Sequence, residues 1–208
     1  FFVRLAKYGR EIAPAATKVS VRAPKATSYG RTVAVRVTTE SLKGAAKDAE
    51  ATLYFEPQGV SSTRAKVTSI TLDAEGKGVF KVPAQASGSW TVSVEGSWSR
   101  ASGESEPATT TVRYAVQAQA SPTKVAVGTP VTITGSVSPG AAGTAVTVQR
   151  RSATGTWRDV SSTTTGSGGS VNVIVKPTVV GAISYRLLVP ASAGLAQGAS
   201  PRITLTVT

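Results

Sequence analysis

Hydrophobic and polar residues alternate along this chain in short runs with a period of two residues. Val33, Val35 and Val37 show the pattern in the first half, and Val131 and Ile133 show it in the second half. The alternation continues in the runs 90–94, 146–148, 171–175, 183–187 and 203–207. A period of two is typical of strands with one face toward a core and the other toward water. Val and Thr dominate these runs, which favours strands over helices.

Segments rich in Gly, Pro and Ser separate the runs at intervals of about ten residues, as turns do in all-β proteins. They include 138–143, 163–169 and 190–194. The segment 43–53 resembles a helix, but it contains Gly44 and has no apolar stripe, so we predict a loop that leads into a strand. About seven short strands in a unit of about 94 residues predict an antiparallel β-sandwich.

The chain also contains an internal repeat. Pro107 and Pro201 precede similar β-type tails 94 residues apart. Pro24 and Pro122 begin similar segments at an offset of 98 residues, and unequal loops account for the difference. Self-similarity of this kind is the signature of one structural unit that occurs more than once.

We therefore predict two β-sandwich domains, residues 17–115 and 116–208, that follow each other directly near residues 114–120. No Gly-Ser tract separates them, so we expect little bending between the domains. We interpret residues 1–16 as the end of a preceding repeat. The alternative is that they add a strand to the first domain.

The composition excludes several classes of chemistry. The chain has no Cys and no His, and therefore no disulfide, thiolate nucleophile or imidazole base. Residues 116–208 contain one acid, Asp159, and so no carboxylate pair for glycoside hydrolysis. Asp73 and Glu75 could hold Ca²⁺, but we predict a plain turn there. We expect no enzymatic activity, no cofactor and no metal. Met is also absent, so we expect a fragment or a processed product.

The formal net charge is +12 at pH 7. Residues 1–115 carry 16 basic and 10 acidic side chains, and residues 116–208 carry 7 and 1. No Lys/Arg block and no nucleic-acid motif is present, so we do not expect nucleic acid to be the main partner. Arg150, Arg151 and Arg158 are the predicted contact for anionic polymers such as wall teichoic acid or acidic polysaccharide. The alternative is that they lie flat over the surface and bind nothing.

The tryptophans differ in their predicted environments. Trp90 occupies an alternating position that we equate with Ile183, which predicts a core residue. Trp98 lies in a polar run with the sequence EGSWSRASGESE, which predicts an exposed aromatic contact. Trp157 has three arginines nearby in the sequence, and a guanidinium that stacks on its ring would cover it. No apolar run approaches the ~18 residues needed to cross a bilayer.

The segments VTITGSV (131–137) and VTVQRR (146–151), followed by Trp157 and by Ser200-Pro201, carry a resemblance to a known family. The chain resembles the bacterial immunoglobulin-like repeats of secreted and cell-surface proteins, in the form common in actinobacteria. The resemblance covers residues 117–208 well and residues 17–116 more loosely. It implies extracellular, non-catalytic modules in tandem, and it carries no ligand or catalytic residue to this sequence.

We therefore predict an all-β fold of tandem antiparallel sandwiches, immunoglobulin-like (Ig-like) or fibronectin-III-like. The predicted function is a non-catalytic spacer and interaction segment of a larger exported bacterial protein. Its expected partners are other domains, protein surfaces and anionic cell-wall polymers, at an extracellular or cell-surface location. The alternatives are a carbohydrate- or cell-wall-binding accessory module, and an attachment component of a phage or toxin particle. The first ten residues make a poor signal-peptide core, so we expect any signal sequence to lie upstream.

Overall fold

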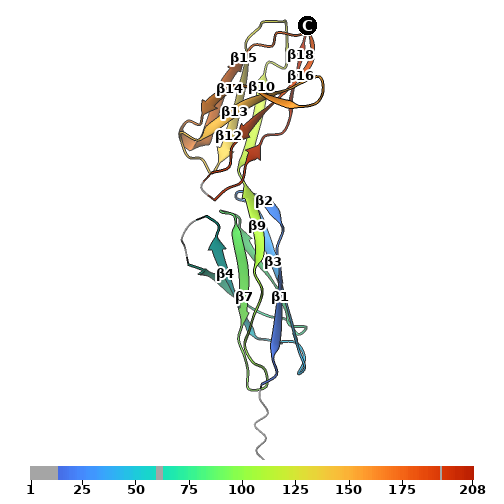
Figure 1. Cartoon of the computed structure of the whole chain (residues 1–208), viewed down its shortest axis with the longest axis vertical. Helices are drawn as coiled ribbons and strands as arrows, with labels where there is room; N and C mark the ends of the chain where they lie inside the picture. Colours follow the sequence, from blue (N-terminus) through green and yellow to red (C-terminus); the bar gives the residue numbers. More distant parts are fainter. Residues whose placement is uncertain (1–13, 60–62, 193) are drawn as a thin grey trace, which may run out of the picture.

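The structure is a computed structural model that describes residues 14–59, 63–192 and 194–208. Figure 1 shows two β-sandwiches that lie end to end along the longest axis. Each sandwich has one three-stranded sheet and one larger sheet. The only helical turn in the described residues is the short 3₁₀ segment Ser167–Gly169.

The first sandwich has sheets with the strand orders β1-β3-β6 and β2-β9-β7-β4-β5, and β8 pairs with β7. All its pairs are antiparallel except β2 with β9. Its strands are β1 (Thr17–Arg22), β2 (Ala26–Ser28), β3 (Thr32–Ser41), β4 (Glu50–Pro57), β5 (Ala65–Thr71), β6 (Lys77–Pro83), β7 (Gly88–Val94), β8 (Gly103–Glu104) and β9 (Ala108–Arg113).

The second sandwich repeats this topology strand for strand, with the orders β10-β12-β15 and β11-β18-β16-β13-β14 and with β17 on β16. Again one pair is parallel, β11 with β18. Its strands are β10 (Ala115–Ser121), β11 (Lys124–Val125), β12 (Val131–Ser138), β13 (Ala145–Arg151), β14 (Trp157–Thr164), β15 (Ser170–Val175), β16 (Gly181–Val189), β17 (Gly198–Ala199) and β18 (Ile203–Val207).

The alternating hydrophobic residues form the cores between the sheets. Val33, Val35 and Val37 on β3 are buried, as are Val131 and Ile133 at the matching positions of β12. Their polar neighbours on the same strands are less buried. The prediction of an all-β fold with tandem antiparallel Ig-like sandwiches is therefore confirmed.

The strand count differs from the prediction of about seven per unit, because each sandwich contains nine strands in the described residues. The additional strands are β2, β8, β11 and β17, which have two or three residues each. Strands this short are held by hydrogen bonds to their neighbours and contain too few residues to show a period. The segment 43–53 forms turns up to residue 49 and then enters β4.

A buried serine in each sandwich shows which positions of the two units correspond. The Oγ atom of Ser105 accepts a hydrogen bond from the amide of Val92 (3.0 Å), and Ser200 does the same for Leu187 (3.0 Å). Ser200 lies 95 residues after Ser105, and Leu187 lies 95 residues after Val92. Trp90 of β7 therefore corresponds to Tyr185 of β16. The predicted equivalence of Trp90 and Ile183 is therefore wrong by two residues, although Trp90 is buried as expected. Loops of unequal length caused that error.

Residues 1–13 of the predicted remainder 1–16 lie outside the described residues. Ala15 is described and lies against the first sandwich. Its amide donates to the carbonyl oxygen of Ser99 (3.0 Å), and its own carbonyl oxygen accepts from the amide of Ala101 (2.9 Å). The chain has therefore joined the first sandwich by residue 15.

Candidate interaction surfaces

A single residue connects the two sandwiches. Strand β9 ends at Arg113 and β10 begins at Ala115, so Tyr114 alone lies between them. Its side chain is buried, and Figure 1 shows the two strands as one continuous path through the waist of the molecule. Because no free loop is present at this point, the second sandwich begins where the first one ends.

Backbone hydrogen bonds from the loop 190–197 hold this joint. The amide of Ala196 donates to the carbonyl oxygen of Val112 (2.8 Å), and the amide of Tyr114 donates to the carbonyl oxygen of Ala196 (3.1 Å). A third bond runs from the amide of Ser87 in the first sandwich to the carbonyl oxygen of Gly194 (2.9 Å). The joint is therefore a bonded contact between the two sandwiches.

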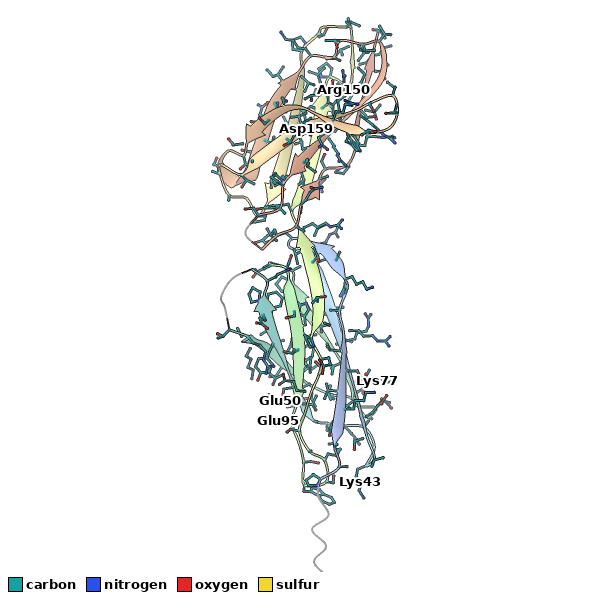
Figure 2. All side chains as sticks on the ribbon, viewed as in Figure 1. Lys43, Glu50, Lys77, Glu95, Arg150 and Asp159 are labelled. Atoms are coloured by element: carbon teal, nitrogen blue, oxygen red, sulfur yellow. The ribbon has the colours of Figure 1, made fainter. Side chains whose placement is uncertain are left out.

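The three predicted arginines do not form one cluster. Arg150 is paired with Arg158 across β13 and β14, so their side chains lie on the same face of the sheet. Arg151 follows Arg150 on the strand and points to the opposite face, where it is paired with Trp157. Figure 2 shows Arg150 on the second sandwich. Arg150 and Arg158 therefore share one face of the sheet, and Arg151 points to the other face.

The guanidinium that covers Trp157 belongs to Arg186 and not to one of its sequence neighbours. The Cζ atom of Arg186 lies 4.4 Å from the centre of the indole ring. Its Nε atom donates to Oε1 of Gln149 (2.8 Å), and Nε2 of Gln149 donates to Oδ1 of Asp159 (2.7 Å). Asp159, the only acid of residues 116–208, therefore supports this chain of bonds, and Figure 2 labels it on the second sandwich.

The first sandwich carries a similar arrangement. The guanidinium of Arg64 lies 4.2 Å above the centre of the Tyr54 ring and binds both carboxylate oxygens of Glu104. The hydrogen bonds from Arg64 lower the pKa of the Glu104 carboxyl, and the same bonds raise the pKa of Arg64. In both sandwiches the guanidinium of an arginine thus lies over an aromatic ring and makes hydrogen bonds to polar groups, which leaves less of its charge free for a partner.

Tyr185 is the buried titratable group near the predicted basic site. Burial raises the pKa of its phenol, and the nearby cation of Arg150 opposes this shift. The two residues are directly paired across β13 and β16. Arg150 therefore lies on the face of the sheet that leads into the core, at the end of the sandwich.

The described aromatic rings are scattered and do not form a row. Trp98 is 93 % exposed and is the only aromatic among the exposed large hydrophobic residues of the described chain. Trp90 is buried, packs against Phe55 with ring centres 4.3 Å apart, and donates from Nε1 to Oγ1 of Thr110 (3.0 Å). A sugar-binding platform of several aligned rings is therefore not found among these residues.

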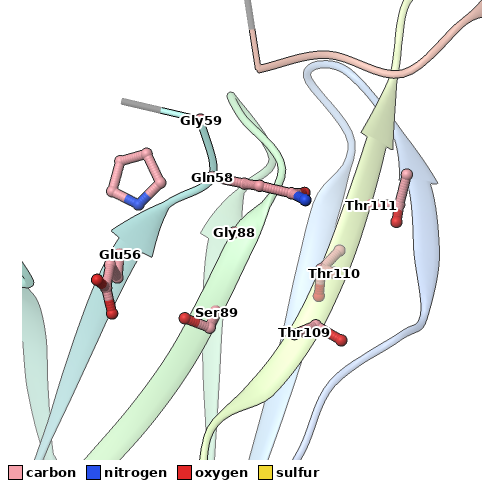
Figure 3. A pocket seen from close by; sticks show the side chains of 9 residues that line it. Glu56, Gln58, Gly59, Gly88, Ser89, Thr109, Thr110 and Thr111 are labelled. Carbon is pink, nitrogen blue, oxygen red and sulfur yellow. The ribbon is translucent and has the colours of Figure 1, made fainter. Parts of the chain in front are cut away.

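A hollow of about 590 Å³ opens on the larger sheet of the first sandwich, near the joint. Figure 3 shows Glu56, Gln58, Ser89 and the threonines 109–111 around it. Among the described residues, no aromatic side chain lines it. The hydroxyl of Thr110 is already used, because it donates to the carbonyl oxygen of Pro24 (2.9 Å). This hollow is polar and open, unlike the mostly apolar sites that bury small ligands.

Asp73 and Glu75 lie in a turn, as predicted. The Oδ1 atom of Asp73 accepts hydrogen bonds from the amides of Glu75 (3.0 Å) and Lys77 (2.7 Å), which closes the turn before β6. In the described part of the chain, no group of three or more acidic side chains is arranged to hold a metal ion. The described residues also include no helix of the length and hydrophobicity that membrane crossing requires.

No family profile and no curated protein sequence matches the chain. The D0-D1 domain of intimin is 15 % identical, with 91 % of this chain and 97 % of that chain covered and a TM-score of 0.36. A tetra-tandem repeat from the extending region of a large adhesion protein is 14 % identical, with coverages of 92 % and 50 % and a TM-score of 0.39.

A superoxide reductase (neelaredoxin) from Ignicoccus hospitalis is 15 % identical to the chain. The match covers 45 % of this chain and 80 % of that chain, with a TM-score of 0.37. The TM-scores and identities of all three structures are too low to assign the chain to a family or to a function.

Proposed function

We propose that this chain is a non-catalytic tandem Ig-like segment of a larger exported bacterial protein. It holds other domains at a fixed distance and contacts proteins or surfaces along its length. The observation that carries the proposal is the joint, in which Tyr114 alone connects two sandwiches and the loop 190–197 binds back to the first one. A flexible linker would transmit neither distance nor direction.

The proposed domain boundaries are those expected from the sequence, 17–115 and 116–208, with residues 1–16 as the end of a preceding repeat. The contacts of Ala15 support the last point. Its carbonyl oxygen accepts from the amide of Ala101, just as that of Val112 accepts from the amide of Ala196. At the start of the first sandwich, Ala15 thus takes the place that Val112, in the last strand of the first sandwich, takes at the start of the second sandwich.

The scattered aromatic side chains favour a spacer over a carbohydrate-binding module. Trp90 is in the core, and the rings of Tyr54 and Trp157 are covered by arginines. The described side chains around the hollow near the joint include no aromatic ring on which a sugar could stack. The net charge of +12 supports a secondary contact with anionic cell-wall polymers, which would weaken as salt rises.

Small-angle scattering of the full chain tests the proposal. We expect the scattering curve to fit one extended, end-to-end arrangement of the two sandwiches. Insertion of a short Gly-Ser segment between Arg113 and Tyr114 should broaden the distribution of interatomic distances. The same insertion between Leu42 and Lys43, in an exposed loop far from the joint, is the matched control and should leave the two sandwiches aligned. An unmodified chain that already scatters as a broad ensemble would contradict the proposal.

A further inference from the structure

The loop 95–102 of the first sandwich repeats the joint loop 190–197 of the second. Both loops have eight residues and connect equivalent strands, β7 to β8 and β16 to β17. The same pair of positions closes each loop: the amide of Ser97 donates to the carbonyl oxygen of Arg100 (2.7 Å), and that of Ser192 donates to the carbonyl oxygen of Leu195 (3.0 Å).

Each loop also binds the strand that enters its sandwich. The amide of Ala101 donates to the carbonyl oxygen of Ala15 (2.9 Å), and the amide of Ala196 donates to that of Val112 (2.8 Å). The glycine that follows each loop closes on this entering chain, so an added Cβ at Gly198 would overlap the carbonyl oxygen of Tyr114. The end at which the chain enters the first sandwich is thus built like the end at which it enters the second sandwich.

The two loops differ in what covers them. In the loop 190–197, the side chain of Leu195 is buried and Gly194 accepts a hydrogen bond from the first sandwich. In the loop 95–102, Trp98 is almost fully exposed, and Nη1 of Arg100 is buried without a hydrogen-bond partner in the described chain. An exposed indole and an unpaired buried guanidinium nitrogen at one loop indicate a missing contact.

We propose that the loop 95–102 is the surface of a second joint, which binds the end of a preceding Ig-like unit and buries Trp98 there. This inference rests on the proposed function, because it extends the observed joint to the other end of the first sandwich. The partner is a unit of the same kind, whose end offers apolar side chains to the indole and cations to the neighbouring acid Glu95.

The outer end of the second sandwich has this chemistry. Val179 and Val180, in the loop before β16, are 56 % and 67 % exposed. They line a hollow of about 310 Å³ together with Arg150, Arg151, Ser152, Ala153, Ala182 and Ile183. Valine side chains and guanidinium groups are both favourable neighbours for an indole ring. A copy of the second sandwich is therefore a suitable partner for the loop 95–102.

The strand register specifies how two copies should be joined to test this. Val112 is paired with Thr27 and Val207 with Val125, so Val207 ends the second sandwich as Val112 ends the first. Val112 in turn corresponds to Ala15. A tandem chain in which residue 208 is followed directly by residue 17 of a second copy therefore reproduces the observed joint without inserted or missing residues.

Acrylamide quenching of tryptophan fluorescence reads the outcome in this tandem chain. One variant carries Trp98→Phe in the first copy and the other carries it in the second copy, so each retains one Trp98. We expect the Trp98 of the second copy to be quenched several-fold less, and to emit at shorter wavelength, than that of the first copy. The first copy is the internal control, because no unit precedes it, and the emission of buried Trp90 reports folding.

Equal quenching of the two Trp98 side chains in the folded tandem chain would overturn the inference. The single chain distinguishes this result from a failure of the proposed function. If the single chain scatters as a fixed end-to-end pair and both indoles are quenched equally, only the second joint is refuted. If the single chain scatters as a flexible pair, the proposed function itself fails.

Discussion

Replacing Ser105 or Ser200 with Ala should destabilise the sandwich that contains it, by a similar amount in each case. Both serines are buried, and each accepts a hydrogen bond from a backbone amide, that of Val92 or that of Leu187, at 3.0 Å. Both amides belong to fully buried residues at the centre of a sheet, where water cannot replace the lost acceptor. Ala keeps the size of the residue, and the backbone bond from the amide of each serine remains.

The main loss is therefore that of one buried amide left without a partner, about 1–3 kcal/mol for each variant. Ser200→Ala also removes the hydrogen bond from Oγ to the carbonyl oxygen of Pro201 (2.9 Å). Urea unfolding followed by tryptophan fluorescence and circular dichroism measures the loss as a lower midpoint with an unchanged slope. Ser20→Ala and Ser136→Ala are the matched controls, because both serines are exposed on strands of the same two sandwiches. They should change stability by less than about 0.5 kcal/mol. If Ser105→Ala behaved like Ser20→Ala, the proposed role of these buried hydroxyls would be refuted.

Three further predictions concern charged groups. The pKa of Glu104 is lowered by Arg64, so its contribution to stability is present above its usual pKa and is lost as the pH falls through the lowered value. In acid unfolding, the free energy of unfolding of Arg64→Gln should therefore depend less on pH in that range than that of the unmodified chain. The difference should be less than about 1 kcal/mol because the pair is on the surface. Burial raises the pKa of Tyr185, so the stability that its neutral phenol supplies should be lost only as the pH rises above 10. Phenolate absorbance should show a late-titrating tyrosine that ionises at still higher pH in Arg150→Gln, and a titration unchanged by the substitution would contradict the assignment. Dextran sulfate should bind weakly and release steeply with salt, with a salt dependence reduced by up to about two counterions when Arg150 and Arg158 are both replaced by Gln; tight binding at high salt would instead indicate a shaped site.

The period-two pattern predicts the long strands because each residue of a half-buried strand must suit the face on which it lies, apolar toward the core and polar toward water. Val33 and Val35 must be apolar wherever β3 faces the core, so the sequence alone shows them. The short strands β2 and β11 could not be predicted in this way, because two or three residues are too few to show a period. Their positions depend on parallel pairing with a strand more than 80 residues away.

The stack on Trp157 shows what could not be predicted at the candidate site. Arg151 and Arg158 are its neighbours in sequence, but the covering cation comes from Arg186 on β16, which is separated from β14 by β13. A register irregularity between Val148 and Gln149 decides which side chains share a face there. Such an irregularity leaves no clear mark in the sequence, so the grouping of the arginines required the structure.

The parallel pairing of the first and last parts of each sandwich has a mechanical consequence. β2 runs parallel to β9, and β11 runs parallel to β18. A force that pulls the two ends of a sandwich apart along the molecule therefore draws these neighbouring strands past each other. The hydrogen bonds between them are loaded in shear and must break together, whereas a hairpin pulled from its open end would unzip one bond at a time. Each sandwich should therefore bear tension along the same axis on which the joint aligns it.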